Sequence, residues 1–297
     1  MITTQTDLRK KTRKTAKMRT IHTTDITENI RQMCIEANHY LSDDMKQVFN
    51  KAVDNEESPL GRQVLEQLKE NLEIASSDMI PICQDTGMAV IFMNVGQEVH
   101  FEGGSITDAV NEGVRQGYTE GYLRKSVVGD PIIRENTKDN TPAVIHYDIV
   151  PGDKVEITVA PKGFGSENMS RIFMLKPADG IEGVKEAILT AVKDAGPNAC
   201  PPMVVGVGIG GTFEKCALLA KKALTRDLNC KSDIQYVNDL EEEMLDKINR
   251  LGIGPGGLGG TQTALAVNIE TYPTHIAGLP VAVNICCHVN RHAHRVI

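Results

Sequence analysis

Three short polar segments of this 297-residue chain each place a cysteine next to a stretch of apolar residues. The first is Cys-Gln-Asp-Thr-Gly at 83–87, which is followed at once by the apolar run 88–93. Cys200 and Cys287 stand in comparable settings far along the chain. Apolar runs of this length are typical of buried strands, and loops at strand ends leave reactive side chains open. We therefore expect the fold to bring the three loops together.

The hydrophobic periodicity indicates a mixture of helices and strands without a regular βαβ repeat, so the expected fold class is α+β. A Pro-Gly-Asp turn at 151–153 predicts that the strands on either side of it pair as a β-hairpin. Cys34 and Cys216 fall on apolar helical stripes and are expected in the core. Helices are predicted near 24–37, 43–54, 60–76, 105–118, 183–194, 212–224 and 239–250, and strands near 88–93, 143–149, 155–159, 203–209, 263–269 and 281–285.

Charge and cysteine content exclude several classes of protein. A net charge of −7 argues against nucleic-acid binding, and no apolar run approaches the eighteen residues of a membrane span. Seven cysteines, an odd number, without a secretory signal favour a reducing compartment, so a cytoplasmic location is expected. Residues 1–20 are strongly basic and almost free of apolar residues. They are expected to be a disordered extension, or the product of a start codon assigned too early, with Met18 as an internal start.

The cysteine pattern points to a cluster of several iron atoms rather than a single metal ion. No Cys-x-x-Cys pair exists, which excludes a zinc ribbon or a ferredoxin-type run. Three thiolates around a cubane cluster leave one iron open, and such an iron is a Lewis acid toward a hydroxyl or carboxylate. The alternative, that all three are ordinary buried cysteines, stays open, although polar neighbours such as Asn198 and His288 favour the cluster.

The glycine-rich segments give weaker signals. Gly206-x-Gly208-x-Gly-Gly lies between a strand and a helix, but its spacing does not match a dinucleotide loop, so close packing is the better interpretation. Gly163-x-Gly165 beside Lys162 is suited to offering backbone N–H groups to a carboxylate. A lone histidine is more often structural than catalytic, so spacing by itself assigns no role to a residue such as His275.

Four motifs taken together resemble the α subunit of class I fumarate hydratase, the iron–sulfur-dependent family that also includes L(+)-tartrate dehydratase. The resemblance runs from about Ile26 to the C-terminus and implies the α+β fold of that family. It also implies one iron–sulfur hydro-lyase domain at 21–297, with residues 1–20 outside it. The motifs lie at 83–87, 162–168, 198–211 and 287–292.

The resemblance implies a 4Fe–4S cluster with one open iron site and a set of residues around it. Of the adjacent pair at 286 and 287, it selects Cys287 as the ligand. Phe164 departs from the family, which has a third glycine there, so its side chain is expected to point away from the cluster. The implied metal ligands are Cys83, Cys200 and Cys287; the implied substrate-binding residues are Gln84, Arg124 and Gly165; and the implied catalytic residues are Asp85 and His275.

The activity implied by the resemblance is the reversible hydration of fumarate to (S)-malate, a reaction of the tricarboxylic acid cycle. The string Gly-Ser-Glu-Asn-Met-Ser at 165–170 resembles fumarases more than tartrate dehydratases. The family's second unit supplies further substrate-binding residues, and this sequence contains no such unit. We therefore expect a hetero-oligomer with a β subunit. Which dicarboxylic acid binds, whether the base comes from the β chain, and the stoichiometry stay open.

One alternative belongs to a different functional class. A non-catalytic iron–sulfur redox sensor would use the same three cysteines, and its only hint in the sequence is the additional Cys286. The presence of a β-chain partner would distinguish the enzyme from the sensor.

Overall fold

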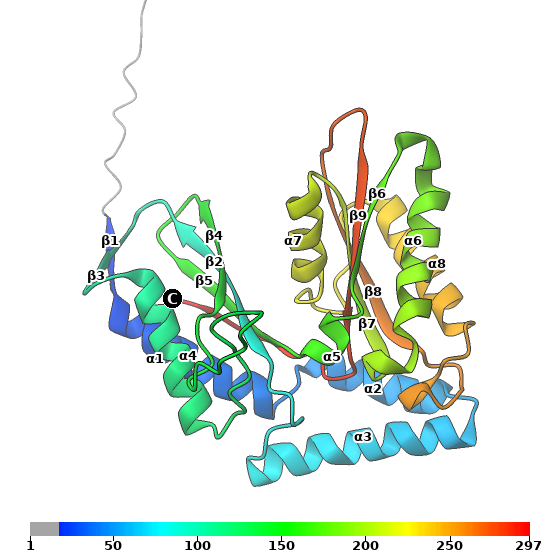
Figure 1. The fold of residues 1–297 in the computed structure, drawn as a ribbon, viewed down its shortest axis with the longest axis horizontal. Coiled ribbons are helices and arrows are strands. Elements are labelled where there is room, and N and C mark those ends of the chain that lie inside the picture. Colours follow the sequence, from blue (N-terminus) through cyan, green and yellow to red (C-terminus); the bar gives the residue numbers. More distant parts are fainter. Residues whose placement is uncertain (1–17) are drawn as a thin grey trace, which may run out of the picture.

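The computed structural model describes residues 18–297, which form two lobes that each contain a four-stranded sheet (Figure 1). Most of the predicted basic extension, residues 1–17, lies outside the described residues. The first strand, β1, begins at Arg19, so residues 19 and 20 belong to the fold. The combination of helices with two mixed sheets confirms the predicted α+β class.

The first lobe packs two helices, α1 and α4, on a sheet with the strand order β10-β5-β2-β4. A parallel pair, β1 and β3, flanks it. Its elements are β1 (Arg19–His22), α1 (Thr23–His39), β2 (Met88–Gly96), β3 (Val99–Glu102), α4 (Ile106–Glu120), β4 (Val144–Val150), β5 (Val155–Lys162) and β10 (Ala293–Val296).

The predicted hairpin is wrong in its pairing, although both of its strands exist. β4 and β5 do not pair with each other, because β2 lies between them, parallel to β4 and antiparallel to β5. The physical reason is burial. β2 carries fully buried side chains such as Ile91 and Met93, which suit a central strand, whereas β4 is largely exposed and suits an edge. The turn at 151–153 therefore crosses the end of the sheet.

Gly117 lets α4 approach α1 closely. A Cβ at this position would lie 2.8 Å from the backbone oxygen of Arg31 and 2.8 Å from the Cβ of Cys34. We expect Gly117→Ala to lower the free energy of unfolding by roughly 1–2 kcal/mol, because the overpacking outweighs the higher helix propensity of alanine. Urea unfolding measures this change.

A matched control for this substitution is Gly278→Ala, whose added methyl would meet no atom closer than 3.9 Å. This variant should unfold within about 0.5 kcal/mol of the unmodified protein, as do most surface changes. Equal stabilities for the two variants would contradict the close packing of α1 on α4.

The second lobe is a sandwich of helices around the sheet β6-β9-β7-β8. Helices α6 and α8 cover one face and α7 covers the other (Figure 1). Its elements are α5 (Phe164–Glu167), β6 (Arg171–Leu175), η1 (Pro177–Asp179), α6 (Gly180–Ala195), η2 (Gly196–Ala199), β7 (Met203–Gly210), α7 (Phe213–Ala223), α8 (Gln235–Asn249), η3 (Pro255–Gly257), β8 (Ala264–Tyr272) and β9 (Leu279–Cys286).

The packing interpretation of the glycines in β7 is confirmed. A Cβ on Gly208 would lie 2.0 Å from the backbone oxygen of Cys216, so only glycine admits α7 at this distance. Cys34 and Cys216 are both fully buried, as the apolar stripes predicted.

Two further helices, α2 (Asp43–Asn55) and α3 (Pro59–Asp78), lie below the second lobe in Figure 1, where one end of α3 reaches toward the first lobe. Their apolar side chains form a third core with residues next to the cysteine loops, among them Ile82, Cys286 and Val289. This core fixes the beginning of the first cysteine loop relative to the end of β9. Among residues 18–297, no helix has the length and apolar character needed to cross a membrane.

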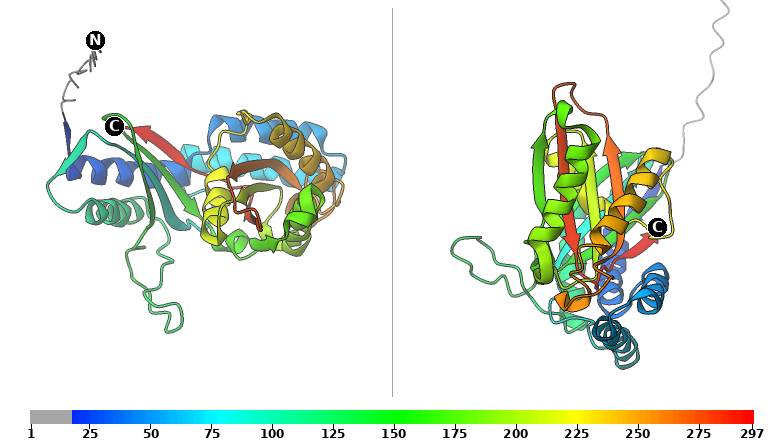
Figure 2. Two further views of the ribbon diagram at one scale, coloured as in Figure 1. Left: turned by 90° about the horizontal axis from the view of Figure 1, so that it is seen from above. Right: turned by 90° about the vertical axis from the view of Figure 1, so that its right-hand side faces the viewer.

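An ordered arm, residues 121–143, projects from the first lobe between α4 and β4 (Figure 2, green). Asn140 anchors its base, since its side chain accepts hydrogen bonds from the backbone of Ser126 and Val127 and donates one to the oxygen of Gly87. At the tip, Ile132 and Ile133 are 86% and 78% exposed.

Candidate functional site

Hydrogen bonds join the three cysteine loops to one another. The backbone N–H of His288 donates to the backbone oxygen of Cys200 over 3.3 Å, and its ring Nδ1 lies 3.0 Å from the same oxygen. Arg291, on the same segment, donates from Nη2 to the backbone oxygen of Asp85. The segment that follows Cys287 therefore contacts both of the other loops.

The thiols of Cys83, Cys200 and Cys287 lie close enough to influence one another. Burial raises the pKa of Cys200, and the neighbouring thiols of Cys287 and Cys83 raise it further. Cys286 ends β9 and lies inside the third core. The hydrogen bond from Cys287 lowers the pKa of Cys286 to about 6, and the cations of Lys162 and Arg291 add to this.

The first cysteine loop is held from three sides. The backbone N–H of Ile82 donates to the oxygen of Asn38, and the side chain of Asn71 donates to the oxygen of Ile82 over 3.0 Å. On the other side of the cysteine, the hydroxyl of Tyr118 donates to the oxygens of Thr86 and Gly87 at 2.7 and 3.0 Å. Burial raises the pKa of Tyr118, so this hydroxyl stays protonated as a donor.

Asp85 links the first cysteine loop to the glycine loop. Its Oδ2 accepts the backbone N–H of Phe164 over 2.8 Å, and its Oδ1 accepts that of Gly87 over 3.0 Å. Both carboxylate oxygens therefore accept backbone hydrogen bonds in this arrangement. The side chain of Phe164 is half exposed. The acid–base role of Asp85 stays a prediction.

The three predicted substrate-binding residues lie on exposed positions around this loop. The oxygen Oε1 of Gln84 is 3.3 Å from the Cys83 sulfur. The backbone of Arg124 exchanges two hydrogen bonds with the Thr86 hydroxyl, so the start of the arm is fixed beside the loop. Gly165 lies in α5 with open space where a Cβ would be. Their contact with a substrate stays a prediction.

His275 is the one predicted site residue that the chain does not bring to the cysteines. It lies in the exposed turn between β8 and β9, four residues before β9 begins, whereas Cys287 directly follows the end of that strand (Figure 1). Eight residues of strand at about 3.3 Å each separate the two ends by roughly 25 Å. A catalytic role for His275 stays a prediction, and it requires that a second chain bring the histidine to the site.

A buried lysine, Lys162, and a partly buried one, Lys221, were missed by sequence reasoning as functional residues. Glu167 pairs with Lys162 at 3.3 Å and with Lys221, and Asn284 donates to its Oε2 over 2.9 Å. Burial would raise the pKa of Glu167, but the two lysines outweigh it and lower the pKa. Burial in turn lowers the pKa of Lys221 despite this pairing. Lys162 could have been found from its place in the glycine motif, whereas no local signal marks Lys221.

The donor set suits a polynuclear iron–sulfur cluster better than a single ion. Among residues 18–297, no three His, Cys, Asp or Glu side chains are close enough to hold one metal ion. The thiolates of a cubane bind different iron atoms and so stand farther apart than the ligands of one ion. Lys162 and the partly buried Lys221 share a single carboxylate near Cys286, which leaves a surplus of positive charge. A thiolate-bound cluster is anionic and fits that surplus.

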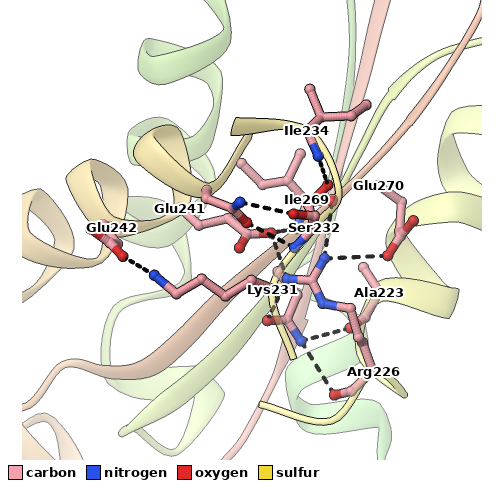
Figure 3. A network of polar contacts seen from close by, with 11 residues as sticks. Ala223, Arg226, Lys231, Ser232, Ile234, Glu241, Glu242, Ile269 and Glu270 are labelled. Atoms are coloured by element: carbon pink, nitrogen blue, oxygen red, sulfur yellow. Dashed lines mark hydrogen bonds and ion pairs between the residues drawn. The ribbon is translucent and has the colours of Figure 1, made fainter. Parts of the chain in front are cut away.

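A second polar network, in the second lobe, has enough carboxylates to neutralise its cation, unlike the two lysines that share Glu167 (Figure 3). Arg226 pairs with Glu241 at 2.6 Å and with Glu270 at 3.4 Å, and Glu241 also accepts the backbone N–H of Ile269. Here two carboxylates neutralise one buried guanidinium, so this network ties the end of α7 to α8 and β8.

Comparison with known proteins assigns the chain to a family. The family model described as "Fumarate hydratase (Fumerase)" matches residues 27–296. The chain is 42% identical over 274 residues to a protein of Methanocaldococcus jannaschii named putative L(+)-tartrate dehydratase subunit alpha, and the match covers 90% of this chain and 96% of that one. It is 31% identical over 270 residues to the L(+)-tartrate dehydratase subunit alpha of Escherichia coli, covering 90% and 88% of the two chains.

Proposed function

Since the chain belongs to the fumarate hydratase family, and within it is an iron–sulfur hydro-lyase subunit, we propose that it hydrates fumarate reversibly to (S)-malate as the α subunit of a two-chain enzyme. The observation that carries this proposal is the meeting of the loops of Cys83, Cys200 and Cys287 at one place, joined by His288 and Arg291. These three cysteines would hold a 4Fe–4S cluster. When bound, the cluster supplies a Lewis-acidic iron for the hydroxyl and a carboxylate of the substrate.

The residues around the cysteines suit the remaining needs of the reaction. Arg124 would bind a substrate carboxylate through its guanidinium fork, and Gln84 and the backbone of Gly165 would orient it. The C–H beside a carboxylate is barely acidic, so the reaction needs a base and stabilisation of the charge that develops. Asp85 is the proposed acid–base residue. The Asp85 carboxylate also accepts the backbone N–H of Phe164 and so positions the glycine loop. The placement of Gly165 therefore depends on that of Asp85.

A tartrate dehydratase is the second candidate, and a specific observation favours it. The two relatives described above are both named as tartrate dehydratase α subunits. The string Gly-Ser-Glu-Asn-Met-Ser at 165–170 supports fumarate instead. Within this string, the side chains of Glu167 and Ser170 accept hydrogen bonds from Asn284. They would therefore affect the choice of substrate indirectly, through the packing of β9, and not by contact with the substrate.

A β subunit and a cytoplasmic location complete the proposal. The relatives' names include "subunit alpha", which supports a partner chain. Exposed apolar side chains at the tip of an ordered arm, Ile132 and Ile133, are typical of a surface that contacts another protein. The cysteines of the described residues are free thiols, which suits a reducing compartment such as the cytoplasm.

The substrate is tested by an anaerobic assay of the chain expressed together with its β subunit. Fumarate, mesaconate and L-tartrate are compared at equal concentrations, and (S)-malate is measured as the product of fumarate. We expect kcat/KM for fumarate to exceed that for L-tartrate by at least about 100-fold, since a site built for fumarate, which has no hydroxyl group, offers no partners to the two hydroxyls of L-tartrate. The opposite preference would establish the tartrate dehydratase instead.

A further inference from the structure

Arg291 is a buried cation whose hydrogen-bonding capacity is mostly unused. The residue is 4% exposed. Its Nη2 donates to the backbone oxygen of Asp85, whereas Nε and Nη1 are buried and have no partner among the described residues. Leaving such donors unpaired in the interior is costly, so a native fold normally supplies a partner for them.

The surroundings of Arg291 indicate what kind of partner is missing. Its charge acts on the thiols of both Cys286 and Cys287. No carboxylate within the described part of the chain forms an ion pair with it, in contrast to Arg226 with its two carboxylates. Lys162 and Lys221 add further positive charge on the same side. An anionic group next to Cys287 would compensate a buried guanidinium in this position.

We propose that Arg291 is the positioning residue that compensates the cluster's negative charge, with Nε and Nη1 as its donors toward the anionic group held by Cys83, Cys200 and Cys287. The inference rests on the proposed function, because it needs the cluster to be present. The same guanidinium holds the first cysteine loop through its hydrogen bond to the backbone of Asp85. Arg291 itself belongs to the segment that follows Cys287, so it links the first and the last cysteine loop. Arg291 therefore couples the placement of two ligands to the charge of what they bind.

The test uses the full chain loaded anaerobically with ferrous iron and sulfide. Arg291→Met and Arg291→Lys are compared with the control Arg295→Met. Arg295 lies four residues after Arg291, is partly exposed and pairs with Glu36, so the control also removes one positive charge. Two quantities are measured: the midpoint potential of the cluster, from a dithionite titration followed by electron paramagnetic resonance, and the rate of iron release to a chelator.

Arg291→Met should lower the midpoint potential, because a lost positive charge destabilises the more negative reduced cluster. It should also speed iron release about ten-fold, as is common for the loss of a partner behind metal ligands. Arg291→Lys should lie between it and the unmodified chain, and Arg295→Met should leave both quantities unchanged. A purely structural Arg291 would speed release without moving the potential, which would overturn the inference.

If Arg291→Met takes up no cluster, Arg291→Gln decides, because it also removes the charge: a potential equal to that of the unmodified chain overturns the inference, and a lower one supports it. If the unmodified chain itself takes up no iron and sulfide, the proposed function fails, and the inference fails with it. If the unmodified chain is loaded and all variants match it, only the inference fails.

Discussion

Cys287→Ser should abolish the brown absorbance of the cluster and with it the hydratase activity, whereas Cys286→Ser should retain most of both. Cys287 follows the end of β9 and acts on the thiol of Cys200 together with Cys83. Cys286 is the last residue of the strand and is packed in the third core. The two positions are adjacent and chemically identical, so each variant is the matched control for the other.

This prediction is measured by visible absorbance, iron content per chain and fumarate hydration, all under anaerobic conditions. A residual activity below about one thousandth is expected for Cys287→Ser, since removing a group that acts on the reacting atoms costs at least this much in many enzymes. The reverse pattern, with cluster loss in Cys286→Ser alone, would move the third ligand by one residue and would leave the cluster itself intact.

The chain alone should hold the cluster yet hydrate fumarate negligibly, and adding the β subunit should restore turnover. Arg124 lies exposed beside the first cysteine loop, and a small dianion normally requires more than one such partner. Cys200, Gln84 and Gly165 are exposed in the isolated chain, so water reaches the site and weakens its electrostatics. The restored rate should be at least about 1000-fold higher, on the scale of an assembled charge-stabilising site.

The measurement compares turnover and the decay of cluster absorbance in air, with and without the β subunit. Both should improve together, because one contact surface excludes water and oxygen at once. A chain that hydrates fumarate at an enzyme-like rate without β would show that the whole pocket lies within these residues. If activity returns while the cluster decays in air as fast as before, the β subunit supplies missing substrate-binding groups but does not shield the cluster from oxygen.

Local patterns predicted the helices and the long strands well, because apolar periodicity depends on near neighbours. The helix predicted over 60–76 is observed at Pro59–Asp78, and the strand predicted over 203–209 is observed at Met203–Gly210. The four short strands β1, β3, β6 and β10 were not predicted, since four or five residues carry too little periodicity. The pairing of β4 with β2 was also missed, because it depends on a segment about fifty residues away.

The residues of the candidate site also differ in whether a local pattern or a distant part of the chain identifies them. Cys83 and Cys200 stand in local motifs, so the sequence indicates them directly, and Gln84 and Asp85 follow with the first motif. Arg291 falls within the motif at 287–292, but its burial cannot be read from that motif, and Lys221 has no local signal because its importance comes from a neighbour on another element. His275 was named from the family resemblance, yet it lies at the opposite end of β9 from Cys287. A local motif therefore does not by itself place a residue at the site.

The strand β10 belongs to the first lobe although it follows every element of the second. It pairs with β5, more than 130 residues earlier, from Ala293↔Val159 to Val296↔Glu156. During synthesis on the ribosome, β2, β4 and β5 therefore emerge long before the strand that completes their sheet. The first lobe must wait, with one sheet edge unpaired, until the second lobe has been made. Cys287 emerges in the same final stretch, so the proposed cluster could be inserted only after both lobes have been translated.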